Sequence, residues 1–262
     1  MLITSKDNDT IKFLKKLKDK KYRDQENAYI IEGAKLIKEA IQENIKIKMV
    51  ILCDGCSAEN AIDSDLKYEI AKYECICVSE KIFLGLTNVV NPQGILAVVE
   101  KNNNTNEIDY NDNLFLILDD LQDPGNMGTI LRTADSINLK QIIVSKGSAD
   151  VYNPKVVRST MGAIFRIKVI ESDDLSKTIK EMKKHKIKVA ATSLQTDKSI
   201  YDINYEKTAI VIGNEANGVS DKVLETVDEK IKIPMAGKTE SLNASVATAI
   251  VLYEAVRQKM TK

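Results

Sequence analysis

Short apolar runs separated by polar turns recur through the second half of the chain. The clearest is residues 114–118, Leu-Phe-Leu-Ile-Leu, whose lack of alternation predicts a strand buried on both faces. Further strands are expected at residues 141–145, 164–170, 188–193, 208–213 and 230–233. Helix-period patterns lie between most of them, and a long final helix is expected over residues 241–259. This alternation predicts an α/β fold with a mainly parallel sheet covered by helices on both faces.

The first hundred residues have a less regular pattern of helices and strands. Amphipathic helical patterns cover residues 11–22 and 33–42, and strands are expected at 46–53, 74–78 and 94–99. The Asn-rich segment 101–112 has almost no core residues and is typical of a linker. We therefore expect a smaller α/β domain at residues 1–100, a linker at 101–112 and a larger α/β domain at 113–262. Within the larger domain, Asn153-Pro154 predicts a helix start.

Composition excludes several classes of function. The 262 residues carry no net charge, so an interaction with nucleic acid must depend on local basic patches. No signal core or membrane-length apolar run is present, and four cysteines without a secretion signal indicate reduced thiols in the cytoplasm. The single histidine, His185, argues against Ser-His, Cys-His and multi-His metal chemistry. We expect no membrane contact and no metal ion.

Three polar, glycine-containing turns follow predicted strands. Ligand sites in open α/β sheets lie beyond the carboxyl ends of the strands, which is where these turns would be. Each turn alone is explained by ordinary strand ends, helix caps or close helix packing. Three together, each with an amide, a carboxylate or an Arg, indicate a shared site. The turns span residues 119–134, 213–220 and 233–247.

Two nucleotide-binding motifs are absent. Ala236-Gly237-Lys238-Thr239 is similar to the end of a phosphate-binding P-loop, but Lys232, in a predicted strand, occupies the position of the first glycine. No G-x-G-x-x-G follows a strand, which argues against a standard dinucleotide site.

The three turns resemble the signature motifs of the SpoU/TrmH branch of the SPOUT RNA methyltransferases, over residues 113 to about 258 and in the right order and spacing. The matching residues are Asn126-x-Gly128 with Arg132-Thr133-Ala134, then Gly213-x-Glu215-x-x-Gly218, then Ile233-Pro234-Met235 with Ser241-Leu242-Asn243-x-Ser245-Val246-Ala247. Residues 1–100, with Glu32-Gly33 before a helix and Gln93-Gly94 before a strand, resemble the ribosomal-protein-like substrate-binding domain of that family.

This resemblance implies an S-adenosylmethionine-dependent enzyme that methylates a ribose 2′-hydroxyl of RNA. It also implies a trefoil knot at the cofactor pocket and a homodimer. The extra N-terminal domain favours ribosomal RNA as the substrate over transfer RNA.

The resemblance also implies roles for five residues. Arg132 would bind the target phosphate and assist deprotonation of the hydroxyl. A guanidinium stays protonated, so we favour phosphate clamping and stabilisation of the developing alkoxide, with a base role left open. Asn126 and Asn243 would position the ribose and Arg132, Glu215 would hold that network, and Ser241 is a further polar candidate.

The cofactor would lie against backbone groups of Gly213, Ile233 and Leu242, with Leu194 near the adenine. Plain core packing explains the side chains of Ile233 and Leu242 equally well.

Two basic features could contact the RNA backbone. One is Arg158, which an ordinary surface position also explains. The other is a run that is equally well explained as a solvated helix face: Lys12, Lys15, Lys16, Lys18, Lys20, Lys21 and Arg23.

The cysteines nearly match a zinc site. Cys53-x-x-Cys56 and Cys75-x-Cys77 stand 18 residues apart, but the second pair has one spacer residue instead of two. Buried free thiols are the favoured interpretation.

Two alternatives compete with the enzyme. One is a non-catalytic RNA-binding protein that keeps the fold, against which the intact set of Asn126, Arg132, Glu215 and Asn243 argues. The other is a small-molecule methyltransferase of ordinary Rossmann type, whose glycine-rich first turn is missing.

Overall fold

The computed structural model describes residues 2–55, 62–101 and 107–260. The chain forms two compact units, one from residues 1–103 with 152–165 and the other from 104–151 with 166–262. The expected domains differ from these units in one respect. Residues 152–165, which we expected in the second domain, group with the first unit.

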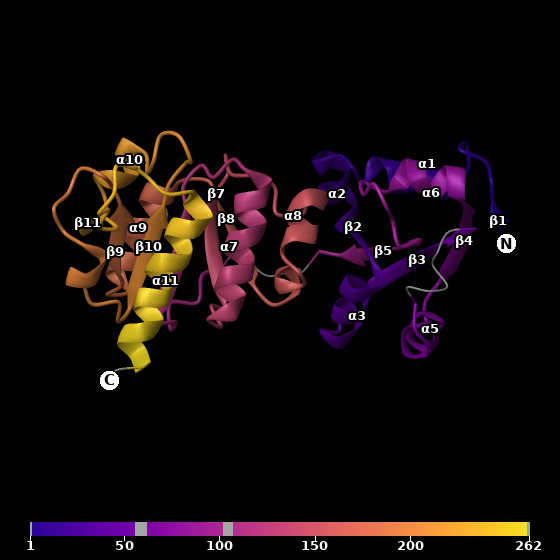
Figure 1. The fold of residues 1–262 in the computed structure, drawn as a ribbon, viewed down its shortest axis with the longest axis horizontal. Coiled ribbons are helices and arrows are strands. Elements are labelled where there is room, and N and C mark those ends of the chain that lie inside the picture. The colour runs from indigo at the N-terminus through magenta and orange to yellow at the C-terminus, as the bar shows by residue number, and fades with distance from the viewer. Residues whose placement is uncertain (1, 56–61, 102–106, 261–262) are drawn as a thin grey trace. The chain divides into compact units, whose positions relative to one another are not determined.

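A five-stranded sheet in the order β1-β4-β3-β5-β2 forms the centre of the first unit (Figure 1). Strands β1, β4 and β3 are mutually parallel, whereas β5 is antiparallel to both β3 and β2. Three of these strands, β3, β4 and β5, lie within one residue of the predicted ranges. The strands are β1 (Leu2–Ile3), β2 (Ala28–Glu32), β3 (Ile47–Asp54), β4 (Cys75–Ser79) and β5 (Ile95–Glu100).

Helices cover both faces of this sheet. Buried residues of α1 and α6, among them Leu14 and Phe83, pack on one face against Ile51 and Leu96, while α3 and α5 lie on the other (Figure 1). The helices of this unit are α1 (Asp9–Lys16), α2 (Lys20–Glu26), α3 (Ala34–Gln42), α5 (Ser64–Ile70), α6 (Glu80–Leu86), α8 (Pro154–Ser159) and the 3-10 turn η1 (Ala163–Phe165).

The single helix expected over residues 11–22 is wrong, because the chain breaks between α1 and α2. Asp19 caps α2 by accepting a hydrogen bond from the Lys21 amide at 2.9 Å. Arg23 Nη1 donates to the carbonyl oxygens of Leu17 at 2.8 Å and Lys18 at 2.7 Å. Arg23 is therefore buried at the end of α1, and its expected role in an exposed basic run is also wrong.

Residues 152–165 join the first unit through α8 and β2. The rings of Tyr29 and Tyr152 lie 4.7 Å apart. As predicted, Asn153 caps α8 by accepting from the Lys155 amide at 2.9 Å, and Pro154 is its first residue. The strand expected at 164–170 is wrong at its start, since η1 occupies Ala163–Phe165 and β8 begins at Lys168.

The second unit contains a six-stranded sheet in the order β11-β9-β10-β6-β7-β8, and every pairing is parallel. Strands β6 and β10 lie side by side in its centre, with Leu118 opposite Ile212 at their carboxyl ends. The first and second polar turns therefore begin next to each other. The strands are β6 (Leu114–Leu118), β7 (Gln141–Ser145), β8 (Lys168–Ser172), β9 (Lys188–Thr192), β10 (Thr208–Ile212) and β11 (Glu229–Ile231).

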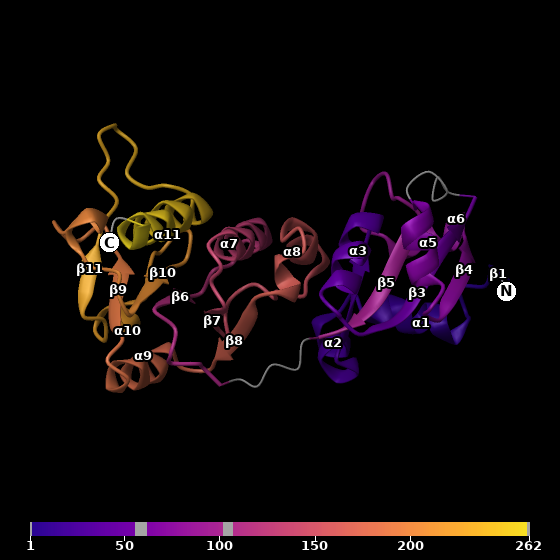
Figure 2. The ribbon, with the colours of Figure 1, turned by 90° about the horizontal axis from the view of Figure 1, so that it is seen from below.

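Helices α7 and α11 cover one face of this sheet and α9 and α10 the other (Figure 2). Ile179 and Met182 of α9 pack under Phe115 and Ile117 of β6. The mainly parallel α/β fold is thus confirmed, although α11 begins three residues after the predicted start at Ser241. The helical elements are α7 (Pro124–Ser136), α9 (Leu175–Lys184), the 3-10 turn η2 (Ile200–Asp202), α10 (Asp221–Leu224) and α11 (Ala244–Met260).

No helix within residues 2–55, 62–101 and 107–260 has the length and apolar character needed to cross a membrane.

Candidate functional site

Three predicted site residues form one chain of hydrogen bonds, which we call the amide relay: Glu215, Asn126 and Asn243. Asn126 Nδ2 donates to Glu215 Oε1 at 3.0 Å, and Asn243 Nδ2 donates to Asn126 Oδ1 at 2.9 Å. Asn126 is buried, so its amide has a single well-defined orientation. The relay connects all three polar turns, because its members come from the turns after β6, β10 and β11.

Each end of the relay is fixed to backbone. Asn243 is the N-cap of α11, and its Oδ1 accepts from the backbone amides of Ser245 at 2.9 Å and Val246 at 3.4 Å. At the other end, Glu215 accepts from the amides of Gln122 at 3.1 Å and Asp123 at 2.9 Å. The relay is therefore ordered without a bound ligand.

Glu215 is a stable anion in this arrangement. Partial burial raises the pKa of Glu215, but hydrogen bonds from Asn126 and the two loop amides outweigh that effect and hold the pKa below its ordinary value of 4.5. A carboxylate with a lowered pKa is a poor proton acceptor at neutral pH. The same carboxylate fixes the orientation of the Asn126 amide through its hydrogen bond.

Arg132 differs from the relay residues. Its side chain is exposed on α7, and it has no hydrogen bond or ion pair with any residue that the structure describes. Arg132 follows Asn126 by six residues, which places it about 9 Å farther along the helix. The expected network between Arg132 and Glu215 is not formed, and the guanidinium is available for an anion such as phosphate.

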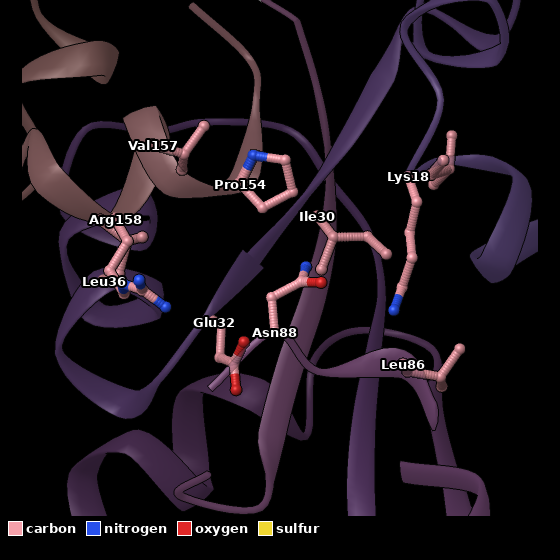
Figure 3. A pocket seen from close by; sticks show the side chains of 10 residues that line it. Lys18, Ile30, Glu32, Leu36, Leu86, Asn88, Pro154, Val157 and Arg158 are labelled. Atoms are coloured by element: carbon pink, nitrogen blue, oxygen red, sulfur yellow. The ribbon is translucent and has the colours of Figure 1, made fainter. Parts of the chain in front are cut away.

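A cleft of about 460 Å³ lies beside the relay, at the carboxyl ends of β9, β10 and β11. All four predicted cofactor residues line it, namely Leu194, Gly213, Ile233 and Leu242, together with Glu215 and Ser241. The volume falls within the usual range of small-molecule sites. By contrast, the pocket of the first unit between α8 and β2 (Figure 3) holds only about 20 Å³, room for little more than one water molecule.

One wall of the cleft is a tight hairpin, residues 213–219. Asn214 and Gly218 exchange two backbone hydrogen bonds of 2.9 Å, and Asn214 Oδ1 accepts from the amides of Ala216 and Asn217 at 2.9 and 3.1 Å. Gly213 is required here, because a Cβ at that position would overlap the backbone of Gly218 and Val219. The close approach of Gly213 to Gly218 and Val219 therefore sets the conformation of this wall.

Ser241 and Leu194 are exposed in the cleft. Leu194 is 67% exposed, so its apolar side chain is accessible for packing against a planar ligand. Ser241 lies outside α11 and does not cap it, because Asn243 does.

Sequence reasoning missed several residues that hold the site together. Asp123 caps α7 by accepting from the Asn126 amide at 2.7 Å, and Asp123-Pro124 is a helix-start signal that could have identified it. Ser220 Oγ donates a hydrogen bond to Asp119 Oδ2 at 2.7 Å. The sequence signal for Asp119 was a carboxylate directly after the buried strand 114–118.

The remaining sequence candidates lie in the first unit. The lysines of the basic run are exposed, and so is Arg158. Cys75 is exposed and Cys77 half-buried, both as free thiols, so the expectation that the thiols are buried is wrong for Cys75. Cys53 is buried but belongs to a disulfide bond, so the expectation of a free thiol is wrong for Cys53. Cys56 lies outside the described residues, and the part of the chain that the structure describes holds no group of three potential metal ligands.

Comparison with known proteins identifies both parts of the chain. Residues 113–253 match the SpoU rRNA Methylase family, and residues 8–97 match the MRM3-like substrate binding domain. The 23S rRNA (guanosine(2553)-2′-O)-methyltransferase RlmP of Bacillus subtilis is 36% identical over 256 residues, which are 96% of this chain and 97% of that protein.

Solved structures have the same fold over the whole length. The crystal structure of an RNA 2′-O ribose methyltransferase has 31% identity and a TM-score of 0.83, covering 99% of this chain and 100% of the other. An AdoMet-bound rRNA methyltransferase from Sinorhizobium meliloti has 27% identity and a TM-score of 0.86, covering 98% of both chains. Because the family match covers residues 113–253, more than half of the sequence, this chain belongs to the SpoU rRNA methylase family.

Proposed function

We propose that this protein transfers a methyl group from S-adenosylmethionine to a ribose 2′-hydroxyl of RNA. The observation that carries the proposal is the position of the cleft beside the relay, since all four expected cofactor residues line the cleft and Glu215 belongs to both. The family match and the similarity to RlmP support the same reaction.

The residues present fit the proposed cofactor. A purine with an attached amino-acid chain needs an apolar surface, backbone hydrogen bonds and a volume of several hundred Å³. Leu194, Ile233 and Leu242 supply apolar surface, and the hairpin 213–219 supplies backbone groups. When bound, S-adenosylmethionine supplies an already activated methyl group, so the protein needs only to orient the hydroxyl and assist loss of its proton.

We assign the substrate half of the site to Arg132 and the relay. Arg132 clamps the phosphate next to the target ribose and stabilises the charge that develops on the 2′-oxygen. Asn126 and Asn243 position the ribose, Glu215 fixes their orientation, and Ser241 offers a further hydroxyl.

The proposed substrate is ribosomal RNA. Residues 8–97 match a substrate binding domain, and RlmP of Bacillus subtilis is a 23S rRNA methyltransferase by its name. Exposed lysines of α1 and α2 provide a surface for the RNA backbone. Transfer RNA is the alternative, and mapping 2′-O-methylation in total RNA from a deletion strain and its parent distinguishes the two.

The proposal extends to a homodimer, a trefoil knot at the cofactor pocket and a cytoplasmic location. The supporting argument is membership of the family. Sedimentation at micromolar concentration tests the dimer, with twice the 29.2 kDa chain mass as the expected result.

Calorimetry with S-adenosylmethionine is the first test of the function. Binding with one site per chain is the expected result, and no heat of binding would remove the basis of the enzyme proposal. A non-catalytic RNA-binding protein would bind RNA without transferring a methyl group.

A further inference from the structure

The carboxylate of Asp119 lies at the end of β6, outside the amide relay and outside the cleft lining. It is 7% exposed, and no described Lys, Arg or His forms an ion pair with it. Its Oδ2 accepts from both the amide and the hydroxyl of Ser220, at 2.8 and 2.7 Å. Burying a carboxylate without a counter-charge costs free energy, so we expect Asp119 to have a role that offsets this cost.

Ser220 shows what that role is. It occupies the N-cap of α10, where a serine hydroxyl normally accepts from the helix amides, yet it forms no side-chain cap. Its hydroxyl instead donates to Asp119 across 101 positions of sequence. A local stabilising interaction is given up for a long-range one, which is typical of functional regions.

The residue after Asp119 holds the other side of the same hairpin. Asn214 Nδ2 donates to the carbonyl oxygen of Asp120 at 2.8 Å. Asp120 itself has a φ of 55°, a left-handed conformation that is uncommon outside glycine, and its amide donates to Ser145 Oγ at 2.8 Å. Asp119 and Asp120 therefore grip the hairpin 213–219 at both ends, through Ser220 and Asn214.

We infer that Asp119, acting through Ser220, is a positioning residue that sets the hairpin 213–219 for both halves of the site. The backbone of the hairpin lines the cleft, and Glu215 within it orients Asn126. Loss of the hydrogen bonds between Asp119 and Ser220, which we call the clamp, therefore weakens cofactor binding and also misaligns the relay. This inference rests on the proposed function for its kinetic consequences, but not for its effect on the hairpin.

The test compares Ser220→Ala with Ser220→Thr in the full chain. Ser220→Ala removes the hydroxyl donor, and Ser220→Thr keeps it. Loss of one hydrogen bond to a buried charge is expected to raise the Kd for S-adenosylmethionine about tenfold and to lower kcat, with the threonine variant within about twofold of wild type. Hydrogen exchange measured without ligand should accelerate at the amides of Ala216, Asn217 and Gly218 in the alanine variant alone.

Each outcome decides the inference. Wild-type affinity, turnover and hydrogen exchange in Ser220→Ala would overturn it, as would a loss of thermal stability with unchanged kcat and KM. Failure of the wild-type chain to bind S-adenosylmethionine would instead refute the proposed function, and the exchange rates would still test the clamp. If Ser220→Ala does not fold, Asp119→Asn replaces it, since the amide oxygen keeps an acceptor for Ser220. Exchange and affinity should then change by about threefold. Wild-type exchange and affinity in Asp119→Asn would contradict the inference.

Discussion

The two walls of the cleft are built in different ways. The hairpin 213–219 has internal backbone hydrogen bonds, is fixed to β6 and carries Glu215 into the relay. The connection 234–242 between β11 and α11 lines the same cleft through Met235, Glu240, Ser241 and Leu242, but it forms no hydrogen bond with any described residue. Figure 2 shows this golden segment projecting away from the sheet.

This difference separates two contributions to binding. The hairpin wall is ordered before the ligand arrives, so it adds affinity without a further loss of conformational entropy. The 234–242 segment has no such hydrogen bonds within the described structure, so we expect it to lose conformational entropy when the ligand binds. The Arg132 side chain is similar to this segment in one respect, since it also forms no hydrogen bond with any described residue.

The largest expected effect comes from breaking the ordered wall. Gly213→Ala places a Cβ against the backbone of Gly218 and Val219, so the hairpin cannot keep its conformation. We expect the free energy of unfolding to fall by roughly 3 kcal/mol and binding of S-adenosylmethionine to be lost. Denaturant titration and calorimetry measure the two effects.

Gly237→Ala is the matched control for Gly213→Ala in the other wall. A Cβ at Gly237 meets no atom within 4 Å. Its unfolding free energy should change by less than about 0.5 kcal/mol. Equal destabilisation by the two variants would show that the walls do not differ.

Arg132→Ala tests the group that has no described partner. We expect kcat to fall roughly 10²–10³-fold, because a charge-stabilising donor is lost from the transition state. Cofactor affinity and thermal stability should stay close to wild type. Arg132→Lys keeps the charge but not the two-pronged geometry and should be intermediate. Unchanged turnover in Arg132→Ala would refute the assigned role.

Glu215→Gln should affect stability and activity together, unlike Arg132→Ala. The NH2 group that replaces one carboxylate oxygen cannot accept from the backbone amide bound to that oxygen, which is Gln122 for Oε2 and Asp123 for Oε1. We expect a loss of about 1–2 kcal/mol in unfolding free energy and a roughly tenfold fall in turnover. A variant that loses activity with full stability would mean that Glu215 contacts the substrate instead.

The smallest effect concerns pH. Because folding lowers the pKa of Glu215 below 4.5, its charge stabilises the fold above that value, and the contribution is lost as the pH falls through the lowered pKa. The stability difference between wild type and Glu215→Gln should therefore stay constant between about pH 5 and 8 and shrink under more acidic conditions. Thermal unfolding of both proteins across this range measures it, and a difference that grew on acidification would contradict the assigned pKa direction.

The sequence was most informative where local pattern alone determines structure. The apolar runs at 114–118 and 208–213 predicted two buried strands, and the neighbouring positions of these strands in the sheet bring Asn126 and Glu215 together. The strand at 28–32 was not predicted, because a run as short as Tyr29-Ile30-Ile31 does not distinguish a strand from a helix.

Long-range interactions explain the remaining differences. The break between α1 and α2 depends on Arg23, whose hydrophilic side chain suggested a surface position but binds backbone carbonyls instead. The pairing of Asp119 with Ser220 joins two turns far apart in sequence, and only the order of β6 and β10 in the sheet brings them together. The same holds for residues 152–165, whose helix was predicted but whose packing in the first unit was not.

Transfer of labelled methyl from S-adenosylmethionine to ribosomal RNA by the purified protein, followed by alkaline hydrolysis, tests the central claim most directly. A methyl group on the 2′-oxygen blocks attack of that oxygen on the neighbouring phosphodiester. The account predicts that the label appears in an alkali-resistant dinucleotide with the wild-type protein and not with Arg132→Ala. Label recovered in ordinary mononucleotides, or no label at all, would contradict it.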